Sequence, residues 1–188
     1  IVRSLGEGSV ERAIIAVANS EIGTLADAFE AMGEHEVHIT AEAILRVRHQ
    51  LLVAPETESL DEINLIRSNP KAIDQCSAYI ISLLSDRPDL LIDRTGTDTA
   101  SCARQVAEGG DPGMAAIAGR RTAERYGLKI LEADIEDNSN NLTRFWMLEG
   151  EARPAPDADT TSLMLALPHR SGALYEALGV WAGRGINL

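Results

Sequence analysis

The chain alternates short apolar runs with segments of helical spacing, and this alternation limits the possible folds more than any single motif does. The runs at 12–19 (RAIIAVAN), 63–68 (INLIRS) and 113–119 (GMAAIAG) are typical of buried strands. Segments of helical spacing lie between them, for example at 23–33 (GTLADAFEAMG) and 97–110 (TDTASCARQVAEGG). The alternation predicts an α/β fold with a largely parallel sheet.

Two longer segments carry their own signals. In 68–84 (SNPKAIDQCSAYIISLL), Asn69 suits a helix N-cap and Pro70 suits the first helical position, which predicts one helix there. The run 35–55 (HEVHITAEAILRVRHQLLVAP) mixes β-branched residues with alternation. It predicts either one long strand or two strands separated by a kink.

Charge excludes several classes of partner. Lys and Arg number 17 and Asp and Glu number 29, which gives a net charge of −12. A chain this acidic repels phosphates, so nucleic acid and anionic membranes are excluded as expected partners. An anionic small molecule would need locally placed arginines or helix N-termini.

Other bulk features favour a cytoplasmic protein. Cys76 and Cys102 lack motif spacing, which indicates small buried groups in a reducing compartment. No apolar run approaches the roughly 18 residues that span a bilayer, and no signal peptide opens the chain. The four histidines lack companions at metal-ligand spacing, so we expect surface or strand histidines and no metal. No P-loop, dinucleotide fingerprint or G-x-S-x-G motif is present.

Four corners occur where a strand precedes a helix; three carry small hydroxyl or amide residues, and the fourth, at 116–122, is small and flexible. In open α/β sheets, ligands bind beyond the carboxyl ends of strands, against helix N-termini. Each polar residue also has a plain structural explanation, such as capping for Asn19 and Asn69 or simple exposure for Gln75. The helix starts at Asn69 and at Thr97 or Asp98 offer backbone N–H groups to a carboxylate. The corners are 17–23 (VANSEIG), 66–72 (IRSNPKA), 94–100 (RTGTDTA) and 116–122 (AIAGRRT).

The stretch 137–145 (DNSNNLTRF) is a polar loop that runs into an apolar strand at 142–150. It suits either a surface turn or a substrate site. After it, 151–159 (EARPAPDAD) has the composition of a linker. Residues 160–188 predict a strand, a turn at Gly172, a helix of about eleven residues and the start of another strand.

Several motifs together resemble the prephenate dehydratase family. The matching stretches are NSEIGT, SNPKAIDQC, DTASCA, AAIAG with AERYGL, and DNSNNLTRF, in the family's order. Beyond the linker, TSLMLALPHRSGALYEAL with RGINL resembles the opening of an ACT regulatory domain. The resemblance covers essentially the whole chain.

The resemblance implies a fold and its division into domains. Residues 1–150 are expected to form a two-lobed α/β catalytic domain of the periplasmic-binding-protein-like (type II) kind, with a cleft. A linker at 151–159 and a partial α+β ACT domain at 160–188 are expected to follow. The Gly-rich opening of the family's catalytic domain and the end of its ACT domain are not found in this sequence.

The implied reaction is the decarboxylating dehydration of prephenate to phenylpyruvate in L-phenylalanine biosynthesis, with no cofactor because aromatisation drives it. The resemblance assigns the catalytic roles to Asn19, Ser68, Gln75 and Thr143, with Thr143 as the donor to the leaving hydroxyl. The substrate-binding set is Ser20, Thr99, Arg144 and Phe145. The guanidinium fork of Arg144 suits a carboxylate clamp, and the alternative is an ion pair with an acidic neighbour.

The ACT resemblance implies feedback by L-phenylalanine and a homo-dimer or tetramer. The effector contacts would be Gly172, Ala173 and Leu174. Three alternatives stay open: an arogenate dehydratase, a weakened relative that binds small molecules without turnover, and a chain fused to a chorismate mutase segment.

The chain departs from the family pattern at three corners. It has Ala16-Val17-Ala18-Asn19-Ser20 where the family usually has P-x-E-N-S. It has Ser68-Asn69-Pro70-Lys71-Ala72 for S-H-P-Q-A, and Asp98-Thr99-Ala100 for S-T-A. The lost Glu at position 18 leaves open how that corner is organised.

Overall fold

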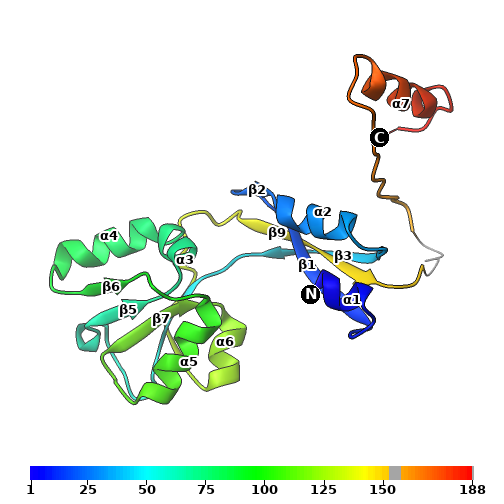
Figure 1. Ribbon diagram of the computed structural model, residues 1–188. Coiled ribbons are helices and arrows are strands. Elements are labelled where there is room, and N and C mark those ends of the chain that lie inside the picture. Colours follow the sequence, from blue (N-terminus) through cyan, green and yellow to red (C-terminus); the bar gives the residue numbers. More distant parts are fainter. Residues whose placement is uncertain (153–157, 188) are drawn as a thin grey trace.

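The strand-like runs of the sequence pair into two separate sheets, one in each of two lobes (Figure 1). The computed structural model describes residues 1–152 and 158–187. The first lobe has the strand order β2-β1-β9-β3 and the second has β6-β5-β7-β4-β8. The α/β class predicted from the sequence pattern and the two-lobed form implied by the family resemblance are both confirmed.

Two helices cover one face of the sheet in the first lobe. Apolar side chains of α1, α2 and β1 pack there, and the rings of Phe29 and Trp146 meet edge to face at 5.4 Å. The opposite face leaves apolar groups such as Ile14 exposed. The elements of this lobe are α1 (Val2–Gly6), β1 (Arg12–Asn19), β2 (Gly23–Thr24), α2 (Ala26–Gly33), β3 (His38–Arg46) and β9 (Leu142–Glu149).

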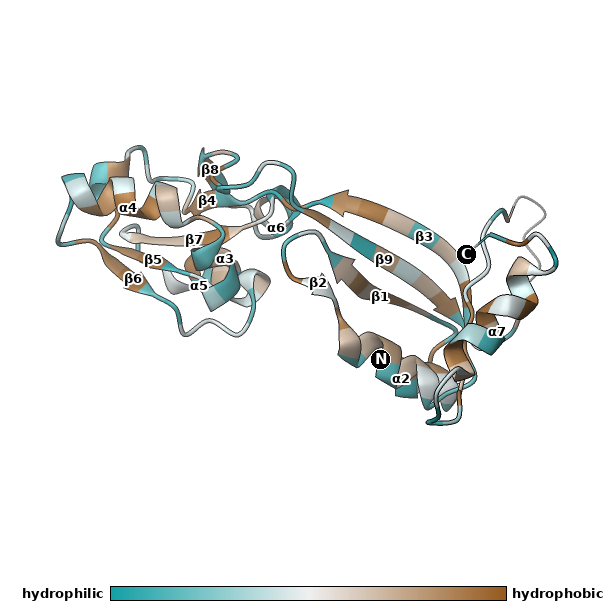
Figure 2. Cartoon of the chain, turned by 90° about the horizontal axis from the view of Figure 1, so that it is seen from above, coloured by the Kyte–Doolittle hydropathy of each residue, from teal (hydrophilic) through white to brown (hydrophobic). Residues whose placement is uncertain are grey.

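The second lobe contains the larger core. Its strands are mostly apolar (Figure 2), and Leu51, Ile66 and Ile117 are completely buried. Its strands are β4 (Gln50–Val53), β5 (Leu65–Arg67), β6 (Leu91–Asp93), β7 (Met114–Ala118) and β8 (Lys129–Glu132). Its helices are α3 (Pro70–Asp74), α4 (Ser77–Asp86), α5 (Thr99–Gly109), α6 (Arg120–Tyr126) and the 3-10 helix η1 (Leu60–Glu62).

The prediction of a largely parallel sheet is wrong. Every strand pair of the first sheet is antiparallel, and in the second sheet only β5 pairs in parallel, with β6 and β7. The reason is that the chain changes lobe after β3 and returns only at β9. Strand β9 then lies between β1 and β3 and runs antiparallel to both. Alternation of strands and helices does not reveal such a crossing.

Two segments of the sequence each form two separate elements in the structure. The run 35–55 forms two strands, β3 and β4, in different lobes, so the two-strand alternative is correct. The single helix predicted over 68–84 is instead α3 and α4, which are separated at Gln75 and Cys76. The predicted helix caps are confirmed. Asn69 accepts the Ala72 N–H at 2.8 Å with Pro70 at the first helical position, and Asp98 caps α5.

The described residues 158–187 contain the helix α7 (Ala173–Ala182), at the end of an extended segment (Figure 1). Its ten residues match the predicted helix, and Gly172 precedes it with a positive φ of 86°. The expected flanking strands are absent from the described residues 158–172 and 183–187. Residues 153–157 of the predicted linker and Leu188 lie outside the described part. The domain boundaries stay a prediction.

The cysteines match expectation, since Cys76 and Cys102 are both free and buried. Burial raises the pKa of the Cys76 thiol to about 12. Across the part of the chain that the structure describes, no helix is both long and apolar enough to cross a membrane.

Candidate active site

The polar loop before β9 anchors a helix of the other lobe. Helix α4 has no side-chain cap of its own at Cys76. The carboxylate of Asp137 supplies one, because it accepts the N–H groups of Ser77 and Ala78 at 3.0 Å each and the Ser77 hydroxyl at 2.7 Å. The Asp137 N–H in turn donates to the carbonyl of Gln75 at 2.7 Å. The loop therefore fixes the α3–α4 junction, where Gln75 lies.

Asn19 and Thr143, two of the predicted catalytic residues, meet at the end of the first sheet. They face each other across β1 and β9, and Asn19 Nδ2 lies 2.9 Å from Thr143 Oγ1 and 2.7 Å from Asn141 Oδ1. The Asn19 Oδ1 accepts the N–H groups of Glu21 and Ile22, which fixes the amide orientation. Because Thr143 Oγ1 accepts from Asn19, its own hydrogen remains available to a ligand.

Gln75 reaches the same site from the second lobe through Glu21. Its Nε2 donates to Glu21 Oε2 at 3.1 Å, and the same oxygen accepts from Asn141 Nδ2 at 3.0 Å. A carboxylate only accepts, so the Gln75 Oε1 must face His49 Nε2, which lies 2.8 Å away. His49 therefore carries a proton on Nε2. Hydrogen bonds thus run from His49 through Gln75, Glu21, Asn141 and Asn19 to Thr143.

Two chain segments cross between the lobes beside this network (Figure 1). One joins β3 to β4 and the other joins β8 to β9. Backbone hydrogen bonds link them: Val47 donates to Asn141 at 2.8 Å and Ile135 donates to His49 at 3.0 Å. The backbone N–H of His49 donates to the buried Glu136 carboxylate at 2.9 Å. The crossing segments thus form a short paired hinge.

A pocket of about 280 Å³ opens between the lobes at this hinge. Both lobes contribute to it, with Thr143 from β9 and Thr99 from the start of α5. His49 is 7% exposed, and its Nδ1 has no hydrogen-bond partner among the described residues. This ring nitrogen is itself buried behind the pocket wall, so it is a polar group that only a water or a local rearrangement could pair. The lining residues are Leu45, Arg46, Val47, Arg48, His49, Thr99, Gly119, Thr143 and Phe145.

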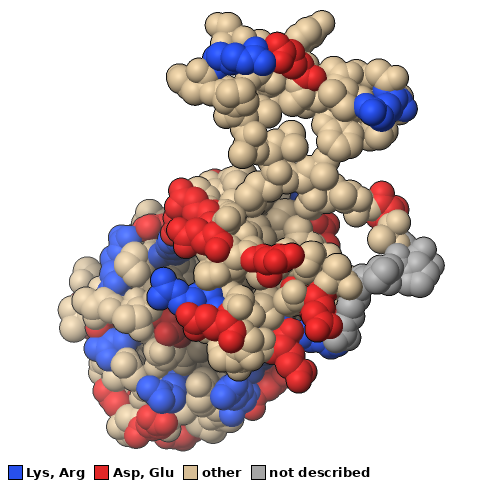
Figure 3. Space-filling model, turned by 45° about the vertical axis from the view of Figure 1, so that its right-hand side comes forward, with Lys and Arg blue, Asp and Glu red and all other residues tan. Residues whose placement is uncertain are grey.

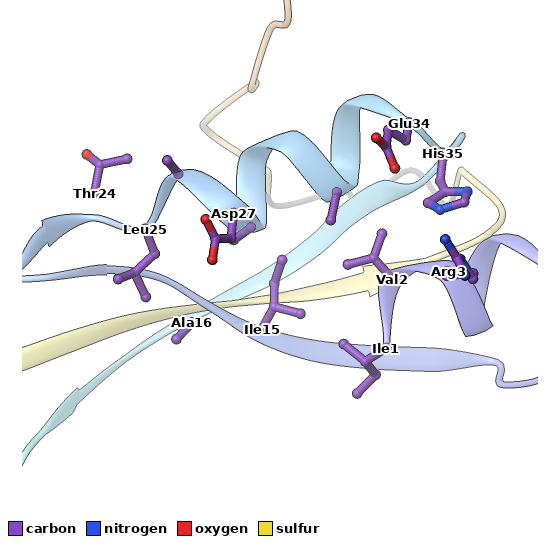
Figure 4. Close-up of a pocket in the computed structure, with 13 residues that line it drawn as sticks. Ile1, Val2, Arg3, Ile15, Ala16, Thr24, Leu25, Asp27, Glu34 and His35 are labelled. Atoms are coloured by element: carbon purple, nitrogen blue, oxygen red, sulfur yellow. The ribbon is translucent and has the colours of Figure 1, made fainter. Parts of the chain in front are cut away.

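A larger cavity of about 610 Å³ lies elsewhere, between α1, β1 and α2 (Figure 4). Its walls carry apolar groups such as Ile15 and Leu25, with Asp27 near one end and Glu34 and His35 near the other. None of the residues predicted for the site lines it. We therefore place the candidate site at the smaller pocket, where the predicted residues converge.

Other predicted residues lie in or behind this site. Thr99 and Phe145 line the pocket. Ser68 is fully buried, and its hydroxyl donates to the Ile117 carbonyl at 2.8 Å, which leaves it only acceptor capacity. Ser20 is exposed and holds the polar loop, because its Oγ accepts the Leu142 N–H at 2.9 Å.

Arg144 does not share the pocket with Thr143. Consecutive residues of a strand point to opposite faces, and Arg144 is exposed beside Glu42, with 3.5 Å between Nε and Oε2. The predicted effector set lies at the start of α7: Gly172 precedes the helix, Ala173 is buried, and Leu174 is 58% exposed.

The start of α5 is already occupied by a carboxylate. Asp98 accepts the Ser101 N–H at 2.7 Å and the Ser101 hydroxyl at 2.6 Å. These bonds, the hydroxyl first, hold the pKa of Asp98 below its usual range. An ionised Asp98 at this position disfavours an anion at the helix N-terminus. Among the described residues, no cluster of three or more His, Cys, Asp or Glu is arranged to hold a metal ion.

Comparison with known proteins identifies the family. The model of the family described as prephenate dehydratase matches residues 1–153. The chain belongs to the prephenate dehydratase family. Arogenate dehydratase/prephenate dehydratase 1 of Arabidopsis thaliana is 36% identical over 181 residues, which are 95% of this chain and 44% of that protein. The chain therefore spans less than half of this relative.

Two solved structures resemble the chain over its length. A prephenate dehydratase from Arthrobacter aurescens in complex with L-Phe is 27% identical with a TM-score of 0.71, covering 100% of this chain and 62% of that one. A structure described as GqqA, a novel type of quorum quenching acylases, is 30% identical with a TM-score of 0.73, covering 99% and 66%.

Sequence reasoning did not assign Glu21, His49, Arg46 and Arg48 to the site. Glu21 directly follows the Asn19-Ser20 pair and is a nearby carboxylate in a chain that has Ala18 where the family has Glu. His49 and the two arginines lie in the run 35–55, whose division between the lobes is not visible in the sequence. A basic cluster in an acidic chain was the available signal for the arginines.

Proposed function

We propose that this chain is the catalytic part of a dehydratase that converts prephenate to phenylpyruvate. The observation that carries the proposal is the hydrogen-bonded series from His49 through Gln75 and Glu21 to Asn19 and Thr143. It joins residues from four distant parts of the sequence, at 19–21, 49, 75 and 141–143, beside one pocket between two lobes.

The reaction requires the C–C bond to the ring carboxylate and the C–O bond of the ring hydroxyl to break. The electron pair of the first bond enters the ring as carbon dioxide leaves, and the pair of the second leaves with the hydroxyl. The departing oxygen needs a hydrogen-bond donor. Thr143 fills this role, because Asn19 donates to its oxygen and leaves its hydrogen free for the substrate.

The other residues bind and orient the substrate. Phe145, Thr99 and His49 line the pocket that holds it. Gln75 and Asn19 hold His49 and Thr143 in place, and Ser68 supports the corner beneath. Arg144 stays a candidate for substrate binding only if its ion pair with Glu42 opens.

Regulation extends the proposal. The resemblance of 160–188 to an ACT domain supports feedback by L-phenylalanine at Gly172, Ala173 and Leu174, in a homo-dimer or tetramer. A solved relative was crystallised with L-Phe. The α7 helix after a Gly172 of positive φ fits the expected turn and helix.

The test is phenylpyruvate formation from prephenate by the full chain and by Thr143→Ala. We expect turnover by the wild type and a kcat about 100- to 1,000-fold lower in the variant with little change in KM, as for loss of one positioned donor in a transition state. Thr143→Ser, which keeps the hydroxyl, should retain most of the activity. Near-wild-type turnover by Thr143→Ala would exclude the assignment.

Arogenate is the second candidate substrate, because the 36% identical relative is named for both activities. It carries an ammonium group where prephenate has a ketone. The same assay with arogenate, detecting phenylalanine, decides between them.

A further inference from the structure

Arg46 and Arg48 bring positive charge to the candidate site, and neither was assigned to it from the sequence. Arg46 ends β3 and Arg48 lies two residues further along the crossing segment. Both line the pocket together with Thr143 and Thr99. The described residues that line it include these two arginines and no Asp or Glu.

The local charge matters because the whole chain is acidic, with a net charge of −12. On the face drawn in Figure 3, basic side chains are interspersed with acidic ones rather than gathered into one patch. The N-terminus of α5 does not compensate, because Asp98 already caps it. An anion in this pocket therefore depends on Arg46 and Arg48.

Each arginine lies beside a carboxylate, but this contact leaves most of its N–H donors unoccupied. The Arg46 Nη2 lies 3.6 Å from Glu136 Oε1, and the Arg48 Nη1 lies 3.3 Å from Asp134 Oδ2. Both contacts are longer than the roughly 2.7–2.9 Å of a strong charge-assisted hydrogen bond. Each guanidinium has five N–H donors. The side chains are 38% and 52% exposed, so donors remain within reach of a ligand.

The two carboxylates also have other donors. Glu136 accepts the His49 N–H at 2.9 Å, and Asp134 accepts from Gln50 Nε2 at 3.2 Å. Neither acid is left unpaired when its arginine turns towards a ligand. The free-energy cost of turning the two arginines away from these carboxylates towards a ligand is therefore small.

We propose that Arg46 and Arg48 bind the side-chain carboxylate and adjacent ketone of an α-oxo acid, and so select prephenate over arogenate. This inference rests on the proposed dehydratase function. A carboxylate and a neighbouring carbonyl oxygen match the forked donors of arginine. The ammonium of an α-amino acid is repelled by both guanidinium groups and meets no carboxylate among the described lining residues.

The test compares Arg46→Gln, Arg48→Gln and the double variant with the wild type on both substrates. We expect the wild type to have the higher kcat/KM on prephenate. In the variants this value falls about tenfold or more, chiefly through KM, as expected for loss of a hydrogen bond to a charged group. Activity on arogenate changes less, so the prephenate preference shrinks. A preference for arogenate in the wild type, or an equal fall on both substrates, overturns the inference.

Arg12→Gln is the matched control. Arg12 is also half-exposed and pairs with a buried carboxylate, Glu149, at 3.0 Å, but at the opposite end of β1 from Asn19. The Arg12→Gln variant should leave turnover of both prephenate and arogenate unchanged. Equal melting temperatures of the Arg46 and Arg48 variants and this control separate a binding role from a structural one.

Calorimetry separates failure of the inference from failure of the proposed function. If the wild type turns over neither substrate, the dehydratase proposal fails. Arginine-dependent binding of phenylpyruvate in preference to phenylalanine would still support oxo-acid selection. Equal binding of phenylpyruvate by the wild type and the double variant would contradict it.

Discussion

Single side chains with limited hydrogen-bonding capacity determine the geometry at the residue scale. The Glu21 carboxylate can only accept, which orients Gln75, and Gln75 then places the proton of His49 on Nε2. Alternation along β9 likewise turns Thr143 to the pocket and Arg144 to Glu42. Glu21 is therefore a positioning residue that touches both lobes through Gln75 and Asn141.

Glu21 and Gln75 should be energetically coupled. We predict that Glu21→Ala and Gln75→Ala each lower kcat/KM, and that the double variant loses less than the sum of the two effects. The expected coupling is about 0.5–3 kcal/mol, which is typical for residues of one hydrogen-bond network. A double-mutant cycle on kcat/KM measures it. The same cycle with Glu21 and the distant Arg12 should be additive, and additivity for Glu21 with Gln75 would contradict the network.

Elements of the two lobes are joined by contacts between residues far apart in the chain. Asp137, which follows β8, caps α4, which begins at Ser77, and this replaces the cap that Cys76 does not provide. The single predicted helix therefore divides at Gln75, where the loop before β9 docks. The polar loop is both a cap for the second lobe and the entry to the strand that carries Thr143.

Removing this cap should destabilise the protein by a predictable amount. Asp137→Ala should lower the free energy of unfolding by about 1 kcal/mol, the usual value for a lost N-cap. Urea denaturation followed by circular dichroism measures the change. Ser139→Ala, an exposed position in the same loop, is the matched control and should have almost no effect. Equal stability of the two variants would show that Asp137 does not cap α4 in solution.

At the scale of the whole molecule, two lobes share one pocket and are linked by two crossing segments. A ligand bound there contacts both lobes, so it stabilises the folded arrangement as a unit. Phenylpyruvate at about 100 times its dissociation constant should raise the free energy of unfolding by about 2.7 kcal/mol. Thermal denaturation with increasing ligand tests this. The Arg46→Gln, Arg48→Gln double variant should need more ligand for the same shift, and absence of any shift in the wild type would contradict binding.

Much of the fold was predictable because its signals are local. Asn69 with Pro70, Asp98 and the short apolar runs depend on neighbours within one turn or one strand, so the sequence shows them directly. Parallel pairing was not predictable, because the crossing after β3 decides it. Gln75 and Thr143 were found by resemblance, whereas Glu21, His49, Arg46 and Arg48 enter the site through contacts between distant segments.

The sequence by itself determined the α/β class, most strands and helices, the caps of α3 and α5, and the resemblance to a dehydratase family. Only the tertiary structure decided that β9 lies between β1 and β3 and that Arg46 and Arg48, rather than Arg144, line the pocket with Thr143. The reason is physical. Propensity and capping act over a few residues, whereas a site between two lobes depends on where the chain crosses from one to the other.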